Sequence, residues 1–317
     1  MKFVSASDVR RLLPMVKAIE VVEQTMIRVA EGKANLPLRT VMDIDGTNKL
    51  GVMPGVLRDP TLYGVKVLSL FPGNPAKGLS SHIGVVILFD AATGEPVVSM
   101  NADAITAIRT AAASAAATRA LSRPDAQSLA IIGTGEQAET HIEAISSVRN
   151  ITELRIAGRT LDRSSAFVAK IGRHYPNLTC RPCSSIKEAV TGAHIVCTVT
   201  SSSEVILQGG WLDAGCHVNA VGASVPSMQE IDVGLVLASD LYVDYKPSAL
   251  AQARDIMTAI SSGQMNEAHI RGEIGDVYRG HAPGRSGPEA ITLYRSLGVA
   301  AQDLACADIV WKAAQPG

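Results

Sequence analysis

A pair of glycines between a short apolar run and a helix start constrains this chain more than any other feature. Residues 129–141 read LAIIGTGEQAETH, which places Gly133, Gly135 and Ala138 in the spacing G-x-G-x-x-A. After a strand, such glycines permit a tight turn and a close backbone approach to a pyrophosphate, and the small third residue lets helix and strand pack. The helix start adds N–H groups and a positive dipole. In this context the pattern predicts a dinucleotide site, with a plain turn as the alternative.

Short apolar strands alternate with helices around and beyond this motif. We expect strands at 128–132, 153–157, 194–199, 217–221 and 240–244, and helices at 136–148, 162–174 and 185–191. Such regular alternation is typical of a parallel, doubly wound sheet. The sequence therefore predicts an α/β fold with a Rossmann dinucleotide-binding domain over residues 121–289.

The first hundred residues are strand-rich and lack this alternation. Apolar residues at helical spacing predict one helix over 5–31, and β-branched runs predict strands at 39–44, 49–57 and 62–71 and a hairpin over 82–100. An alanine-rich segment, 102–123, predicts a long helix. Residues 287–314 predict a terminal helix with Gly298 near its start or in a break.

Composition excludes several classes of function. The formal net charge is −1 without a basic stripe, so we expect neither a nucleic-acid partner nor a membrane-surface partner. No apolar run approaches the roughly 18–20 residues that span a bilayer, and the first residues lack a signal peptide's apolar core, so we expect a cytoplasmic protein. The five cysteines include one C-x-x-C, Cys180 and Cys183, without a second ligand pair, so we expect no metal.

The end of the second Rossmann strand indicates the cofactor. An NAD site usually has an acidic residue there for the ribose hydroxyls. Here the strand ends at Ala157 and Gly158, followed by Arg159, Thr160 and Arg163. Guanidinium groups suit a phosphate by charge and geometry, so we expect NADP(H) to be preferred, with NAD(H) possible. The alternative is that these arginines only solvate a helix start that also carries Asp162.

Cations in unexpected places indicate an anionic substrate. Arg109 lies in an alanine-rich, nearly uncharged helix, and Lys66 lies in the apolar strand YGVKVLSLF. Further candidates are Arg39, Lys77 and His82. A lysine on an exposed edge strand is the alternative for Lys66. A lysine facing a cleft would instead have a pKa that falls on burial, which suits proton transfer. Several cations converging on one site predict a substrate carboxylate.

The chain resembles the ornithine cyclodeaminase/mu-crystallin family over essentially its whole length. The resemblance is carried by LGVMPG at 50–55, VKVLSLFPGN at 65–74, SSHIGVVILFDAATGEPVV at 80–98, ITAIRTAAASAAAT at 105–118, GTGEQA at 133–138, HVNAVGASVPSMQEID at 217–232 and YRSLGVAAQD at 294–303. It implies a second, strand-rich α+β domain for substrate binding and dimerisation, over 1–120 plus 290–317, and a homodimer.

The resemblance also implies site residues. Lys66 and Arg109 would be catalytic and would hold the substrate carboxylate with Arg39 near C4 of the nicotinamide, and Ser224 and Gly298 would complete the substrate site. The residues expected to bind the cofactor are Ser81, His82, Gly133, Thr134, Gly135, Glu136, Gln137, Ala138, Gly158, Arg159, Thr160, Arg163, Thr200, Ser201, Val221 and Ser296.

One departure from the family pattern separates its branches. Cyclodeaminases carry an aspartate just after the NAVG segment, whereas this chain has Ser224, and a hydroxyl is a poor general base near neutral pH. Glu230 and Asp232 lie further along and are expected to be structural. We therefore expect an NAD(P)H-dependent ketimine reductase that transfers hydride to the C=N carbon of 1-pyrroline-2-carboxylate or 1-piperideine-2-carboxylate, giving L-proline or L-pipecolate. The alternatives are an ornithine cyclodeaminase, an alanine-type amino-acid dehydrogenase, and a non-catalytic protein that binds NADPH and a small ligand.

Overall fold

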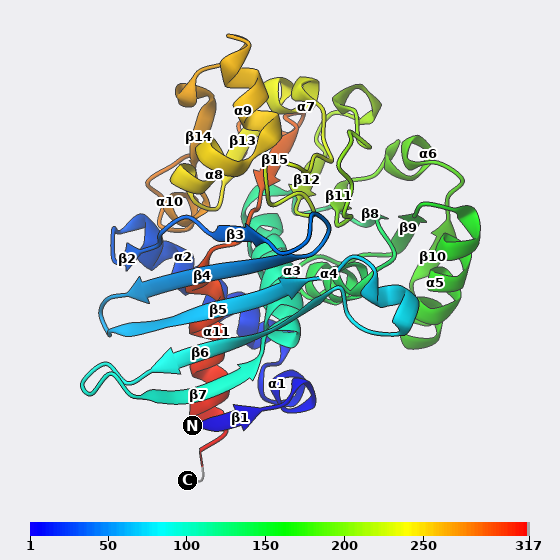
Figure 1. Ribbon diagram of the computed structural model, residues 1–317. Helices are drawn as coiled ribbons and strands as arrows, with labels where there is room; N and C mark the ends of the chain where they lie inside the picture. The colour runs from blue at the N-terminus through cyan, green and yellow to red at the C-terminus, as the bar shows by residue number, and fades with distance from the viewer. Residues whose placement is uncertain (316–317) are drawn as a thin grey trace. The chain divides into compact units, whose positions relative to one another are not determined.

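The computed structural model describes residues 1–315 (Figure 1). The chain divides into two compact units, the first formed by Met1–Arg109 with the segment from Val299 onward, and the second by Thr110–Gly298. The long helix α3 (Ala102–Leu121) contains the junction at residues 109 and 110. Within residues 1–315, no helix is both long and apolar enough to cross a bilayer.

The first unit is built on a seven-stranded sheet in the order β1-β7-β6-β5-β4-β2, with β3 also paired to β4. Its pairs are antiparallel except for β1 with β7. The strands are β1 (Lys2–Val4), β2 (Ala34–Asn35), β3 (Thr40–Asp43), β4 (Lys49–Leu57), β5 (Leu62–Leu70), β6 (His82–Phe89) and β7 (Pro96–Asn101), and a short 3-10 turn, η1, covers Asn74–Lys77.

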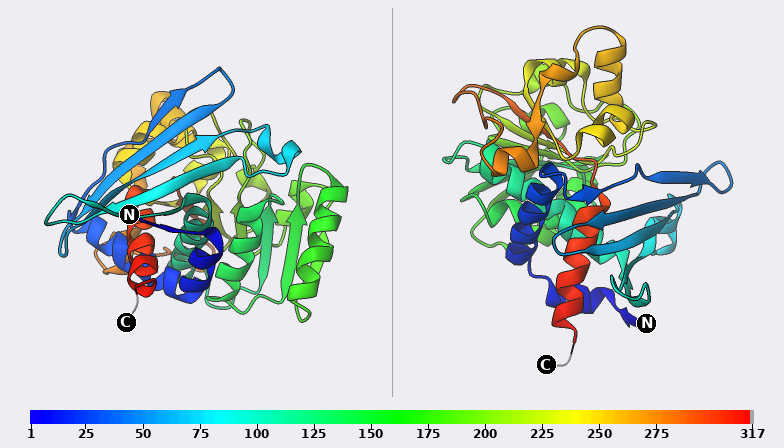
Figure 2. Two further views of the ribbon diagram at one scale, coloured as in Figure 1. Left: turned by 60° about the horizontal axis from the view of Figure 1, so that its bottom comes forward. Right: turned by 90° about the vertical axis from the view of Figure 1, so that its left-hand side faces the viewer.

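Three helices belong to the first unit: α1 (Ala6–Leu12), α2 (Met15–Ala30) and α11 (Ala300–Ala313). The expected single helix over 5–31 is wrong, because Pro14 lacks a backbone N–H and starts a new helix instead of continuing the first. Helix α11 packs against α2 and across β4, β5 and β6 (Figure 2). A Cβ at Gly64 of β5 would lie 2.9 Å from the Leu304 side chain, so the glycine permits this close approach.

The second unit contains an eight-stranded, wholly parallel sheet in the order β10-β9-β8-β11-β12-β15-β13-β14. The strands are β8 (Ser128–Ile132), β9 (Glu153–Ala157), β10 (Thr179–Pro182), β11 (Ile195–Thr198), β12 (His217–Ala220), β13 (Asp240–Val243), β14 (Ile270–Glu273) and β15 (Thr292–Arg295). The doubly wound α/β fold expected from the sequence is confirmed, and every residue of its central strands β8 and β11 is buried.

Helices and short turns connect these strands. They are α4 (Glu136–Ser146), α5 (Leu161–His174), α6 (Ile186–Val190), α7 (Val233–Ala238), α8 (Lys246–Gln252), α9 (Arg254–Ser261), α10 (Ile274–Tyr278), η2 (Gly209–Trp211) and η3 (Glu267–His269). The terminal segment 287–314 is not one helix, because β15 inserts between β12 and β13 before α11 begins. Residues 290–298 thus lie in the second unit, not with the first domain as the resemblance implied, and 110–120 also lie in the second unit.

A buried histidine joins two helices of the second unit. His141 of α4 contacts the carbonyl oxygen of Gln137 through Nδ1 at 2.7 Å and the Ser114 hydroxyl through Nε2 at 2.9 Å. Since a carbonyl only accepts, Nδ1 carries the proton and Nε2 accepts from the serine, so the neutral ring satisfies both contacts. Burial lowers the pKa of His141 to about 4.

Because His141 is buried in its neutral form, we expect the folded state to lose stability in acid. Below its unfolded pKa of about 6.5, the unfolded state takes up a proton that the folded state refuses until about pH 4, so lowering the pH in this window favours unfolding. Each pH unit in the window costs up to ~1.4 kcal/mol of unfolding free energy. We expect His141→Gln to be less stable than wild type at pH 7 but to lose less stability on acidification, as measured by urea unfolding. An unchanged pH dependence would contradict this.

Candidate functional site

Two buried cations and one buried carboxylate meet in the first unit. The Lys66 ammonium lies 2.8 Å from Oδ1 of Asp303, and Nε of Arg109 lies 3.0 Å from the same oxygen. The side chains of Lys66, Arg109 and Asp303 are 1%, 6% and 0% exposed. We call these three residues the cation cluster. It holds two positive charges and one negative charge.

Local structure explains how the cation cluster forms. Lys66 is buried because the alternation of β5 turns its side chain inward, and α3 carries Arg109 one turn after Thr106, whose hydroxyl accepts from the Lys66 ammonium at 3.2 Å. Helix α11 contributes Asp303 and its neighbour Gln302, whose side-chain oxygen accepts from Nη1 of Arg109 at 3.1 Å. The interpretation of Lys66 as an exposed edge lysine is therefore wrong.

The surroundings of the cation cluster shift the pKa values of Lys66 and Asp303. Burial lowers the pKa of Lys66 to about 8, against the opposing charge of Asp303, and the charges of Arg109 and Arg39 lower it further. Burial alone would raise the pKa of Asp303, but the charges of Arg109 and Lys66 outweigh burial and hold that pKa below its ordinary value. At neutral pH both cations and the carboxylate are therefore charged.

Four other expected residues belong to the first unit. Arg39 lies between β2 and β3 and is half-buried. Its positive charge is close enough to lower the pKa of Lys66. His82 begins β6, and its Nδ1 lies 2.9 Å from the Ser81 hydroxyl. Desolvation and the positive charge of Lys66 lower the pKa of His82. Arg39 and His82 thus lie within electrostatic reach of the cation cluster. Lys77 ends η1, outside these contacts.

The glycine motif of the second unit forms a strand–turn–helix. Gly133 follows β8 with φ +130°, and a Cβ there would lie 2.9 Å from the carbonyl oxygen of Val199, so this turn requires glycine. Gly135 precedes α4, no side chain caps that helix start, and a Cβ at Gly135 would meet open space. Ala138 is buried, whereas Thr134 and Gln137 are half-buried and Glu136 is exposed. This geometry suits the backbone approach of a pyrophosphate.

The end of β9 carries no carboxylate. Gly158 follows β9 and packs tightly, since a Cβ there would lie 2.9 Å from the Thr134 side chain. The Thr160 hydroxyl caps α5 by accepting from the backbone N–H of Arg163. Arg159 and Arg163 are exposed, and within residues 1–315 neither guanidinium forms an ion pair, with Asp162 or any other acid.

Glu230 organises the loops after β11 and β12. Its buried carboxylate accepts from the hydroxyl and N–H of Thr200 at 2.7 Å each, from the Thr198 hydroxyl at 2.9 Å, and from the N–H of Gly222 at 2.7 Å. Asp232 caps α7 through the N–H of Leu235. Both acids therefore serve the fold. The loops they hold contain Ser201, Val221 and Ser224, of which Val221 is buried, Ser224 half-buried and Ser201 exposed.

Two expected residues follow β15. The Ser296 hydroxyl is buried and has no hydrogen-bond partner within residues 1–315. Gly298 adopts φ +76°, and its N–H, with that of Leu297, donates to Oδ2 of Asp244. Gly298 is thus held by the backbone turn that precedes α11.

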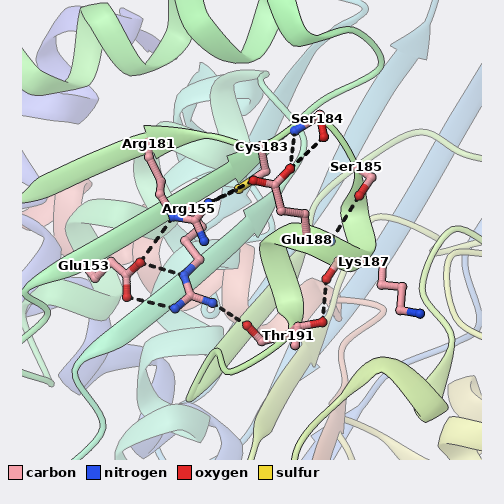
Figure 3. Close-up of polar contacts among 9 residues, drawn as sticks. All are labelled: Glu153, Arg155, Arg181, Cys183, Ser184, Ser185, Lys187, Glu188 and Thr191. Atoms are coloured by element: carbon pink, nitrogen blue, oxygen red, sulfur yellow. Dashed lines mark hydrogen bonds and ion pairs between the residues drawn. The ribbon is translucent and has the colours of Figure 1, made fainter.

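Arg181 and Cys183 of the C-x-x-C segment belong to a polar network that includes residues of β9, β10 and α6 (Figure 3). Cys183 Sγ lies 3.4 Å from Nη1 of Arg181, and Glu153 pairs with both Arg155 and Arg181. Burial raises the pKa of the Cys180 and Cys183 thiols, which disfavours the thiolate that metal binding needs. No group of three or more metal-type ligands occurs among the residues that the structure describes.

The structure adds Asp303 and Gln302, which the sequence interpretation did not assign. Asp303 ends the quoted segment YRSLGVAAQD, and an acid within the apolar run VAAQDLACADIV is as unexpected there as Arg109 is in its own helix. That signal was present in the sequence. The sequence does not indicate which cation Asp303 pairs with, because Lys66 and Asp303 are 237 residues apart.

Comparisons with known proteins identify the family of this chain. The sequence profile of the ornithine cyclodeaminase/mu-crystallin family matches residues 1–317. Ketimine reductase mu-crystallin of Mus musculus is 34% identical over 314 residues, which cover 98% of this chain and 96% of that protein. Delta(1)-pyrroline-2-carboxylate reductase of Thermococcus litoralis, solved in complex with NADH and L-proline, superposes with a TM-score of 0.95 at 34% identity, covering 99% of this chain and 97% of that one.

A third similar structure is an archaeal alanine dehydrogenase dimer with bound NAD, with a TM-score of 0.91 at 30% identity, covering 98% of this chain and 95% of that one. The profile match spans every residue, and the relatives match almost end to end. The resemblance expected from the sequence motifs is confirmed, and the chain belongs to the ornithine cyclodeaminase/mu-crystallin family.

Proposed function

We propose that this chain is a reductase that uses NADPH to convert a small cyclic 2-imino acid, 1-pyrroline-2-carboxylate or 1-piperideine-2-carboxylate, into L-proline or L-pipecolate. The observation that carries the proposal is the charge of the cation cluster. Asp303 balances one of its two buried cations, so one positive charge remains in a site of low exposure. An uncompensated buried charge is costly, and a substrate carboxylate would neutralise it.

Lys66 and Arg109 can hold that carboxylate with groups that the fold leaves available. Arg109 uses Nε and Nη1 within the cluster, and Nη2 has no hydrogen-bond partner within residues 1–315. Lys66 uses two of its three N–H groups, on Asp303 and Thr106. Arg39 adds positive charge nearby. The Lys66 ammonium can also give a proton to the imine nitrogen.

The residues of the second unit fit a nicotinamide dinucleotide. Gly135 presents open backbone before an uncapped helix, and the buried Ser296 hydroxyl lacks a partner that a carboxamide would provide. Such a cofactor, when bound in its reduced form, supplies hydride. Two relatives support this assignment: the reductase solved with NADH and L-proline, and the alanine dehydrogenase solved with NAD.

The loop after β12 favours reduction over amine loss. Ser224 stands where the cyclodeaminase pattern has an aspartate, and the nearest acids, Glu230 and Asp232, are occupied by backbone N–H groups. The reduction needs no general base, because hydride adds to the imine carbon while an acid, the Lys66 ammonium, protonates the nitrogen. The named mammalian and archaeal reductases support the same class of reaction.

The end of β9 supports NADPH as the preferred cofactor. A 2′-phosphate there would meet no carboxylate from β9 itself, and two exposed guanidinium groups, Arg159 and Arg163, flank the single acid of that helix start, Asp162. Charge-assisted bonds from arginine to phosphate are strong and specific.

A second copy of the chain is the proposed partner. All four residues of β3 are exposed, and the apolar side chains of Val41, Met42 and Ile44 are 37%, 53% and 53% exposed. Exposed apolar side chains on a strand that is not fully paired favour association. The dimeric alanine dehydrogenase supports a homodimer.

An NADPH oxidation assay tests the function. Wild type should consume NADPH with 1-pyrroline-2-carboxylate and should release no ammonia from L-ornithine with NAD. Arg109→Ala should lower kcat/KM by roughly 30- to 1000-fold through the lost charged contact, while Arg119→Ala, on the exposed end of the same helix, should not. Ammonia and proline from ornithine would assign a cyclodeaminase instead, and NADPH binding with no turnover of either substrate would favour a binding protein.

Cofactor choice has its own test. Arg159→Ala should weaken the use of NADPH by roughly 10- to 100-fold, as expected for a lost arginine–phosphate contact, and leave NADH use nearly unchanged. Arg173→Ala, exposed near the other end of α5, is the matched control. Equal losses with both cofactors would refute the phosphate assignment.

The dimer is testable by sedimentation velocity. We expect wild type to sediment as a dimer, and the double substitution Met42→Asp and Ile44→Asp to shift it to monomer by placing charges in the apolar interface. A wild-type monomer at micromolar concentration, or a variant that remains dimeric, would exclude β3 as the interface.

A further inference from the structure

We propose that Asp303 is a positioning residue for the reduction: through one carboxylate oxygen it fixes the Lys66 ammonium as the proton donor to the imine nitrogen and orients Arg109 on the substrate carboxylate. The inference rests on the proposed function. No other acid contacts either cation within residues 1–315.

The geometry supports a positioning role. Oδ1 of Asp303 accepts from Lys66 at 2.8 Å and from Arg109 at 3.0 Å, so one atom sets the spacing of the two cations. Gln302 fixes Nη1 of the same guanidinium at 3.1 Å and itself contacts Sδ of Met26 through its amide at 3.4 Å. Two of the three nitrogens of the Arg109 guanidinium are thus held by residues of α11.

The second carboxylate oxygen distinguishes Asp303 from the structural acid Glu230. Oδ2 is buried and has no hydrogen-bond partner within residues 1–315. Glu230, by contrast, uses both oxygens on hydroxyl and backbone donors. Buried carboxylate oxygens are nearly always satisfied in native folds. The open acceptor at Oδ2 indicates a cluster that is completed by a ligand.

The chemical step assigns the proton. As hydride adds to the imine carbon, the electron pair of the C=N π bond moves to nitrogen, which bonds the proton of the Lys66 ammonium. The N–H bond of Lys66 breaks and leaves a neutral amine, which regains its proton from water. The reduced nicotinamide is oxidised and the imine is reduced by the same two electrons. Asp303 stays ionised throughout and stabilises the charged lysine before the transfer.

The groups around Lys66 define the expected pH profile. Burial lowers its pKa to about 8, the charge of Asp303 raises it, and the charges of Arg109 and Arg39 lower it. Desolvation and Lys66 lower the pKa of His82, and burial raises that of the Cys306 thiol to about 12. Lys66 is therefore the member that titrates in the mildly alkaline range. Since the ammonium form is the active one, activity falls as pH rises through about 8.

The test compares pH profiles of kcat for wild type, Asp303→Asn and Asp308→Asn, the last removing a carboxylate elsewhere on α11 that pairs with Lys312. Without the charge of Asp303 the Lys66 pKa drops, so Asp303→Asn should move the alkaline limb down by at least about one pH unit and lower kcat at pH 7 by roughly 100-fold. KM should change less than kcat, and NADPH affinity, followed by fluorescence, should stay unchanged. Asp308→Asn should match wild type.

If Asp303→Asn fails to fold, Asp303→Glu is the second variant, because it keeps the negative charge. It should retain the wild-type alkaline limb but lose kcat, because the added methylene displaces both cations. The proposal would be overturned if Asp303→Glu or Asp303→Asn kept the wild-type kcat and pH profile. It would also be overturned if these substitutions lowered only the melting temperature. A wild type inactive on cyclic imines would overturn the proposed function itself, and this inference with it.

Discussion

One carboxylate oxygen holds two buried cations, and the first unit is arranged around that contact. Lys66, Arg109 and Asp303 come from β5, α3 and α11, which are distant in sequence. Burying three charges is expensive, and the attraction among them repays the cost only with good geometry. The fold supplies that geometry through small residues: Gly55 and Gly64 on β4 and β5 bring α11 close enough for its aspartate to reach the sheet.

In the second unit, too, a buried carboxylate and a close-packed glycine fix the local geometry. Its parallel strands end in loops that must expose backbone to a ligand and still hold their shape. Glu230 holds two of these loops, and Gly222 beside it has no room for a Cβ, which would lie 2.1 Å from the carbonyl oxygen of Thr200. Loops at the carboxyl ends of parallel strands are where ligands bind in such sheets, and here one buried carboxylate hydrogen-bonds to two of them.

Much of this could be read from the sequence because the signals are local. Periodicity located the α/β half, the glycine spacing located the turn at Gly133, and the odd positions of Lys66 and Arg109 marked them as a pair of interest. The missed features are tertiary. Strand β15 lies beside β12 and β13, far from both in sequence, and β10 is a four-residue strand, TCRP, that contains both an arginine and a proline. The role of Asp303 depends on a partner 237 residues away. The break between α1 and α2 has a local cause, because Pro14 has no backbone N–H to continue α1.

The central claim is that the unbalanced charge of the cation cluster selects a carboxylate. The most direct measurement is calorimetric binding of pyrrole-2-carboxylate and pyrrole-2-carboxamide, two planar rings of the same size with a charged and a neutral substituent, to the NADPH-loaded protein. Our account predicts that the carboxylate binds at least about 30-fold more tightly, as expected for a charge-assisted contact worth ~2 kcal/mol or more. Equal affinities for the two compounds would contradict it.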